Sequence, residues 1–114
     1  MKTINIFILG IILSANVQAQ STVITSTLSV KGNCGECKER IENAADIKGV
    51  KNASWKEESQ VFTVTYDTKK VTLDKIEQAI SKAGYETTHI KGDSAAYKAL
   101  PQCCKYNDNK HNKD

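Results

Sequence analysis

The sequence GNCGEC, residues 32–37, places Cys34 and Cys37 between a strand-like run and a helix-like run. Two thiols at the start of a helix suit two kinds of chemistry: the binding of a soft metal ion such as Cu(I) or Hg(II), and thiol–disulfide exchange. The unpaired N–H groups and partial positive charge of a helix N-terminus favour the thiolate form in both cases. The sequence therefore predicts a thiol site at residues 34–37 and leaves both chemistries open.

The residues on either side of this stretch alternate between strand and helix patterns. Period-two runs predict strands, and apolar residues spaced by three and four predict helices, the second of them with Thr72 as its N-cap. The strands are expected over residues 21–30, 50–57, 60–66 and 85–90, and the helices over 35–48 and 73–83. This order is a split βαβ pattern. We therefore expect an α+β, ferredoxin-like βαββαβ sandwich, with a four-stranded antiparallel sheet and two helices on one face.

The two ends of the chain differ in character from this predicted domain. Residues 1–19 combine Lys2, a short apolar run and small residues before Ala19, which is typical of a signal peptide. The apolar run is too short to span a bilayer, so no stable membrane insertion is expected after cleavage. The protein is expected to be exported across the inner membrane to the periplasm. The predicted domain then covers residues 20–91, and residues 92–114 form a cysteine-containing tail, disordered from residue 107 on.

The charged residues exclude several classes of function. The formal net charge is +3, and basic side chains alternate with acidic ones as on a solvated surface. No basic stripe interleaves with aromatic residues, so nucleic acid is not an expected partner. The sequence has no carboxylate pair, nucleophile–base arrangement or phosphate-binding loop. The protein is therefore expected to be a monomer and a binding protein rather than an enzyme.

Several segments together resemble the heavy-metal-associated domain family, which includes copper chaperones, domains of copper-transporting P-type ATPases and periplasmic mercury-binding proteins. They are residues 30–37, 41–44, 49–50, 64–67 and 76–85. The resemblance implies a βαββαβ fold in which Cys34 and Cys37 bind one soft metal ion. It also implies transfer of the ion by thiolate exchange to a metal-transporting membrane protein or another carrier. Cu(I) is the expected ion, followed by Hg(II), with Zn(II) and Cd(II) as further possibilities.

Two other positions gain meaning from this resemblance. Tyr85 matches an aromatic residue that packs near the metal loop of bacterial members and shields it, although an ordinary core tyrosine would look the same. Gly32 stands where the family usually carries a methionine packed under the loop, and the one methionine of this chain is Met1. The departure bears on metal preference rather than on the ligand pair.

Cys103 and Cys104 lie outside the resemblance, and their role is open. Adjacent thiols can form a vicinal disulfide, bridge to the CxxC pair, or add metal ligands. They can also be incidental residues of an exposed tail. If the tail folds back, four thiols would suit Zn(II), Cd(II) or a Cu(I) cluster.

The alternative function is that of a thiol–disulfide oxidoreductase with Cys34 as the attacking thiolate. Thioredoxin-like proteins also place CxxC between a strand and a helix. They usually need a proline that faces the cysteines from a later strand, whereas the one proline here is Pro101, in the tail. The order of strands also differs, so a metal carrier is the preferred prediction.

Overall fold

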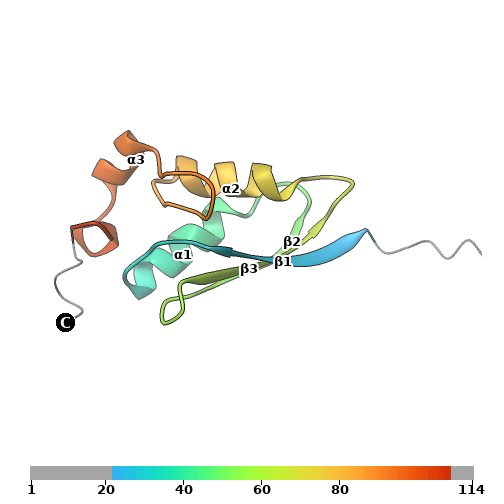
Figure 1. Ribbon diagram of the computed structural model, residues 1–114, viewed down its shortest axis with the longest axis horizontal. Coiled ribbons are helices and arrows are strands. Elements are labelled where there is room, and N and C mark those ends of the chain that lie inside the picture. Colours follow the sequence, from blue (N-terminus) through green and yellow to red (C-terminus); the bar gives the residue numbers. More distant parts are fainter. Residues whose placement is uncertain (1–21, 109–114) are drawn as a thin grey trace, which may run out of the picture.

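The computed structural model describes residues 22–108, and Figure 1 shows its elements. The strands are β1 (Val23–Ser29), β2 (Val50–Lys56) and β3 (Val61–Asp67), and the helices are α1 (Gly35–Ala44), α2 (Leu73–Lys82), α3 (Ser94–Ala99) and the 3₁₀ turn η1 (Gln102–Cys104). The predicted signal peptide and the last six residues of the tail lie outside this range. None of the helices between residues 22 and 108 is long and apolar enough to cross a membrane.

The sheet has the order β1-β3-β2, with both pairs antiparallel. Phe62 of β3 lies opposite Leu28 on one side and Trp55 on the other, so these three side chains form a row across one face. All three are buried. Helices α1 and α2 cover the same face, as Figure 1 shows. The predicted α+β order of strands and helices is therefore confirmed as far as α2.

The predicted fourth strand, over residues 85–90, is wrong. Thr87 makes a single isolated bridge to Val30. Side chains then take the hydrogen bonds that a ladder would have formed, since Ser29 N–H donates to Thr88 Oγ1 (2.9 Å) and His89 N–H donates to Glu77 Oε1 (2.6 Å). The sheet of the described residues therefore has three strands, and a compact loop covers the outer edge of β1.

Helix α1 is also shorter than expected, because the chain turns after Ala44 rather than after Lys48. Gly49 has φ of 99°, the left-handed region that glycine tolerates best. A Cβ there would come within 2.8 Å of Val71. The turn leads directly into β2. Helix α2 begins as predicted, with Thr72 Oγ1 accepting a hydrogen bond from Lys75 N–H (3.2 Å).

Glu77 is a buried carboxylate that fixes the loop after α2. Its side chain is 3% exposed and accepts hydrogen bonds from Thr87 Oγ1 and His89 N–H, both at 2.6 Å. Burial alone would raise the pKa of this carboxyl, but the hydrogen bonds from Thr87 and His89 outweigh it and hold the pKa below its ordinary value. The charged form is therefore the one that the fold stabilises.

Replacing this carboxylate, as in Glu77→Gln, is expected to lower the free energy of unfolding by about 1–3 kcal/mol at neutral pH. The native carboxylate contributes fully above its ordinary pKa of 4.5, and its contribution is lost as the pH falls through the lowered folded value. The difference between the two proteins should therefore shrink in acid. Urea unfolding at pH 7 and pH 3 measures it, with Glu58→Gln in the exposed turn after β2 as the control. A constant difference at both pH values would contradict this account.

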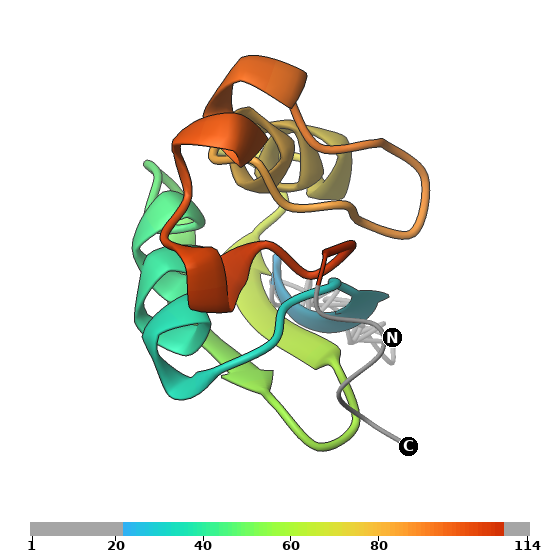
Figure 2. The same ribbon diagram turned by 90° about the vertical axis from the view of Figure 1, so that its left-hand side faces the viewer.

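The tail folds back onto the domain rather than extending from it. Asp93 N–H donates to Ser81 O (2.9 Å), and the Asp93 carboxylate caps α3 through Ala96 N–H (2.9 Å). Tyr106 is buried, and its hydroxyl donates to Gly84 O (2.9 Å). Figure 2 shows the orange and red tail lying across the end of the domain, with η1 beside the start of α1. The first two residues for which disorder was expected, 107 and 108, lie in a turn.

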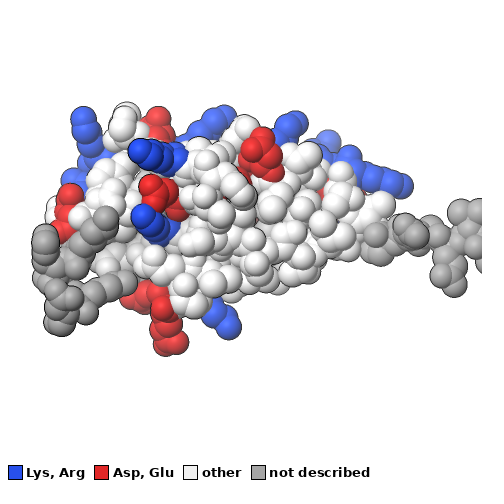
Figure 3. Space-filling model, in the orientation of Figure 1, with Lys and Arg blue, Asp and Glu red and all other residues white. Residues whose placement is uncertain are grey.

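Charges of both signs are spread over the surface seen in Figure 3. Lysine side chains lie among aspartate and glutamate side chains over α2 and α3. Two of the local pairs are Lys31 with Glu86 and Lys38 with Glu42. This face therefore carries no extended patch of one sign.

Candidate metal centre

The loop before α1 is held from both sides. Lys31 N–H donates to Glu86 O (2.9 Å), and the Gln60 side-chain amide donates to Gly32 O (2.6 Å). Cys34 then takes the N-cap position of α1 in an extended conformation. Its N–H points at the Cys37 sulfur, 3.5 Å away. The start of the helix thus directs both side chains of the CxxC pair toward one point.

Four sulfur atoms meet at this point. Cys34 Sγ lies 3.4 Å from Cys37 Sγ, 2.8 Å from Cys103 Sγ and 3.7 Å from Cys104 Sγ. The sulfurs of Cys34, Cys37 and Cys104 all lie within 4.8 Å of one another. All four cysteines are free thiols in this structure. The fold therefore brings the two predicted cysteine pairs together, although about 65 residues of chain separate them.

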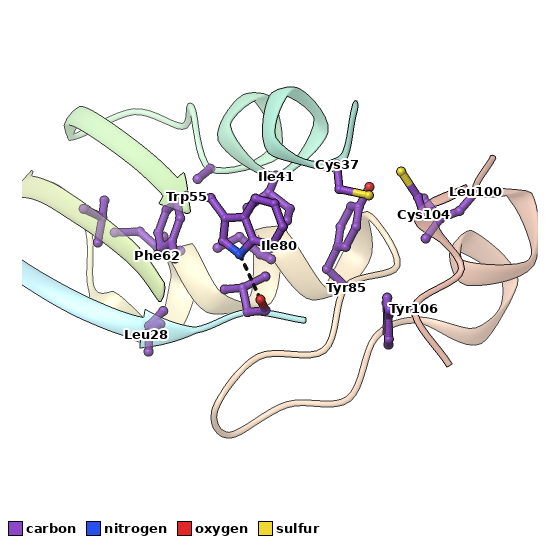
Figure 4. Packing of buried hydrophobic residues seen from close by; sticks show 14 of the residues in the cluster. Leu28, Cys37, Ile41, Trp55, Phe62, Ile80, Tyr85, Leu100, Cys104 and Tyr106 are labelled. Atoms are coloured by element: carbon purple, nitrogen blue, oxygen red, sulfur yellow. Dashed lines mark hydrogen bonds between the residues drawn. The ribbon is translucent and has the colours of Figure 1, made fainter. Parts of the chain in front are cut away.

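The four thiols differ in exposure. Cys37 and Cys104 are fully buried, Cys34 is half-buried and Cys103 is exposed. Figure 4 shows the sulfurs of Cys37 and Cys104 at the end of the core nearest the tail, with the Tyr85 hydroxyl beside Cys37. The cluster therefore opens to solvent on the side of Cys34 and Cys103.

The thiols also differ in acidity. Burial alone would raise the pKa of Cys34, but its hydrogen bonds with Cys103 and Cys37 outweigh burial and lower the pKa from its ordinary value. The hydrogen bond with Cys34 is the main reason that the pKa of Cys103 is raised to about 11. Burial, followed by the contact with Cys37, raises the pKa of Cys104. Cys34, the half-exposed member of the CxxC pair, therefore gives up its proton more readily than Cys103 or Cys104.

Tyr85 lies beside the buried thiols of the cluster, with its hydroxyl next to Cys37. Its side chain is fully buried, and its hydroxyl has no hydrogen-bond partner among residues 22–108 at ordinary distances. Burial and then the Cys104 side chain raise the pKa of Tyr85 above its ordinary value. The ring stacks on Tyr106 with centroids 6.3 Å apart. Tyr85 is therefore a core residue that lies beside the buried thiols Cys37 and Cys104, and its predicted shielding role stays a prediction.

Trp55 explains why this loop lacks the usual methionine. Its ring packs directly under Gly32, where a Cβ would come within 2.7 Å of the ring and 3.3 Å of Cys37 Cβ. The indole N–H donates to Val30 O (2.9 Å) and fixes the ring in that position. The space that a side chain at residue 32 would need is therefore filled by a tryptophan from β2.

The substitution Gly32→Ala is accordingly expected to lower the free energy of unfolding by about 1–3 kcal/mol, through overpacking against Trp55. Gly35→Ala is the matched control, because a Cβ at Gly35 meets nothing within 4 Å. The control is expected to change stability by less than about 1 kcal/mol, since Gly35 lies at the start of α1 and alanine favours a helix. Chemical denaturation of the two variants side by side measures the difference. Equal stability would mean that the loop yields to the added methyl group.

Two residues near the cluster were not identified as functional from the sequence. The Asn33 side-chain amide donates to Cys103 O (2.9 Å), which joins the metal loop to the tail. Glu36 accepts a hydrogen bond from the Cys103 thiol (3.4 Å). Both lie inside the GNCGEC stretch, but no spacing rule indicates a contact with residues so far along the chain.

Comparison with known proteins identifies one family. The pattern of the heavy-metal-associated domain family matches residues 27–86. The copper chaperone CopZ of Staphylococcus aureus is 38% identical over 61 residues, which are 52% of this chain and 90% of CopZ. The family match, residues 27–86, contains the CxxC pair and Tyr85, whereas Cys103 and Cys104 lie beyond it.

Two solved structures are similar in fold. Oxidised MerP from Ralstonia metallidurans has 31% identity and a TM-score of 0.55, over 58% of this chain and 94% of that one. The N-terminal domain of a potential copper-translocating P-type ATPase from Bacillus subtilis, in its Cu(I)-loaded state, has 28% identity and a TM-score of 0.54. The likeness covers 57% of this chain and 84% of that domain.

Proposed function

Because the chain belongs to the heavy-metal-associated domain family, we propose that it is a small carrier that captures Cu(I) through Cys34 and Cys37 and hands it to another protein. The observation that supports this most strongly is the position of the two sulfurs, 3.4 Å apart at the first turn of α1. Soft thiolates bind Cu(I) in preference to hard oxygen ligands. The half-exposed Cys34 offers an incoming thiolate access to the ion, and the buried Cys37 retains it.

The proposed handover is an exchange of ligands without change of oxidation state. A first thiolate of the receiving protein would bind the ion as the bond to Cys34 breaks, and a second thiolate of the receiver would then replace Cys37. Copper stays as Cu(I) throughout, and no electron is transferred. We propose a copper-transporting membrane protein or another carrier as the receiver, since the ATPase domain from Bacillus subtilis shares this fold. On this proposal the protein is not an enzyme.

The site of action proposed is the periplasm, reached by export and removal of residues 1–19. The support is the sequence pattern of those residues. The N-terminal residue of the exported protein is expected to be Gln20. An oxidising compartment favours disulfides, so the carrier would act there with its cysteines either protected by metal or kept reduced.

An anaerobic titration tests the proposed cargo. The reduced mature protein is expected to retain one Cu(I) per chain against a chromogenic chelator. Hg(II) is the second candidate, because of the likeness to MerP, and is titrated in parallel. An insulin reduction assay addresses the oxidoreductase alternative. Turnover of insulin that depends on Cys34, together with no retention of Cu(I), would reject the carrier.

A further inference from the structure

The tail supplies a thiol that the family pattern does not include. Building on the proposed function, we propose that Cys104 is a third metal ligand, so that Cys34, Cys37 and Cys104 form a three-coordinate thiolate site for Cu(I). The tail would then be part of the binding site rather than an appendage to it. Cys104 lies beyond residue 86, where the family match ends.

The spacing of the sulfurs fits three-fold coordination. With metal–sulfur bonds of about 2.3 Å, three thiolates around one ion lie about 4.0 Å from one another. Cys34 Sγ is 3.4 Å from Cys37 Sγ and 3.7 Å from Cys104 Sγ, and all three sulfurs lie within 4.8 Å of one another. Changes of less than about 1 Å in these separations would therefore place the three sulfurs around a single ion.

The tail holds Cys104 at this position by bonds on both sides of it. Cys104 N–H donates to Pro101 O (2.9 Å) and closes the turn η1. One residue earlier, Cys103 O accepts a hydrogen bond from Asn33, and two residues later the Tyr106 hydroxyl donates to Gly84 O. Leu100 and Tyr106 are buried with Cys104 in the core cluster. These contacts fix the Cys104 thiol beside the CxxC pair before any ion binds.

The surroundings of Cys104 suit a soft cation. Tyr85 and Leu100 lie in the same core cluster, and Figure 4 shows the Cys104 side chain turned toward Cys37. A buried thiolate is stable in such a place only when a cation compensates its charge. On binding, Cu(I) displaces the thiol protons, which pass to solvent.

Cys103 differs from its neighbour and provides the control. It is exposed, its thiol donates to Glu36, and it does not belong to the group of three mutually close sulfurs. Two adjacent cysteines therefore have separable roles. Loss of the Cys104 thiol should weaken the binding of the ion. Loss of the Cys103 thiol should remove mainly the hydrogen bond that it makes with Cys34 on the exposed side of the cluster.

The experiment compares Cys104→Ala with Cys103→Ala in the mature chain, by anaerobic Cu(I) competition titration. Cys104→Ala is expected to weaken Cu(I) binding at least tenfold, since even outer-shell partners of a metal site contribute ten- to hundredfold. Cys103→Ala is expected to stay within threefold of the native protein. Equal affinities of the native and Cys104→Ala proteins would overturn the proposal.

X-ray absorption of the Cu(I)-loaded native protein provides a second measurement that needs no variant. A sulfur coordination number near three is expected, falling to two in Cys104→Ala. A value of two in the native protein would overturn the third ligand even if the variant fails to fold. The proposed function fails in a different way: Cys34→Ser/Cys37→Ser would then retain Cu(I) as well as the native chain does, whatever Cys104 contributes.

Discussion

The double variant Cys34→Ser/Cys37→Ser is expected to lose Cu(I) retention by at least about a thousandfold, which corresponds to about 4 kcal/mol. A serine hydroxyl is a hard oxygen ligand and cannot replace a thiolate on a soft ion. The remaining thiols do not rescue the site, because Cys103 is exposed and Cys104 is then alone in the core. The anaerobic chelator competition described above measures this loss.

The matched control changes the same number of thiols in the tail, as Cys103→Ser/Cys104→Ser. It is expected to weaken binding much less than the loss of the CxxC pair. Circular dichroism of both proteins checks that they are folded, since Cys37 and Cys104 are both fully buried. If the CxxC variant still held Cu(I) within threefold of the native protein, Cys34 and Cys37 would not be the ligands.

Trp55→Ala is expected to reduce the free energy of unfolding by about 3–5 kcal/mol, which is a large part of the 5–15 kcal/mol typical of a domain. The ring is fully buried, pairs across the sheet with Phe62 and fills the space under Gly32. Its removal leaves a cavity between the metal loop and the sheet. Urea unfolding measures the loss, and a midpoint equal to that of the native protein would refute it.

A milder substitution separates the two contributions of this residue. Trp55→Phe keeps an aromatic ring in the core but removes the indole N–H that donates to Val30 O at 2.9 Å. Loss of that bond leaves a buried carbonyl without its donor, at an expected 1–3 kcal/mol. Trp55→Phe also loses the smaller ring of the indole, so the remaining difference between the phenylalanine and alanine variants measures the packing of a phenyl ring at this position.

The sequence predicts the elements in which one periodicity dominates. The alternation through β3 and the apolar face of α2 are each explained by burial against a single partner layer, so their period is visible in the residues. The CxxC pair could be recognised because its chemistry depends on local spacing. The resemblance extended these predictions to the α+β fold and the soft-metal site.

The fourth strand could not be excluded in the same way. Residues 85–90 have the composition of a strand, yet Glu77 of α2 accepts the His89 N–H and Thr88 accepts the Ser29 N–H. These are tertiary contacts between segments that local propensity treats separately. The residues have a strand-like pattern, but side-chain acceptors take the backbone N–H groups that strand pairing would have used.

The folded tail was missed for a related reason. Leu100, Cys104 and Tyr106 become buried together, but they lie in a polar stretch too short for a periodic signal. Their contacts are with residues far back in the chain, such as Asn33 and Gly84. A segment whose order depends on docking to another element reveals little of that order in its own composition.

The direction of β1 has a practical consequence for attaching the protein to a surface. The strand runs from Val23 to Ser29, and the cysteines follow beyond its far end. Seven extended residues span about 23 Å, so the start of the strand and the thiols lie at opposite ends of the molecule. A sensor chip or membrane tether joined ahead of Thr22 would therefore leave the thiol cluster exposed to solvent. A tether joined after Asp108 would lie close to the cluster and obstruct access to it.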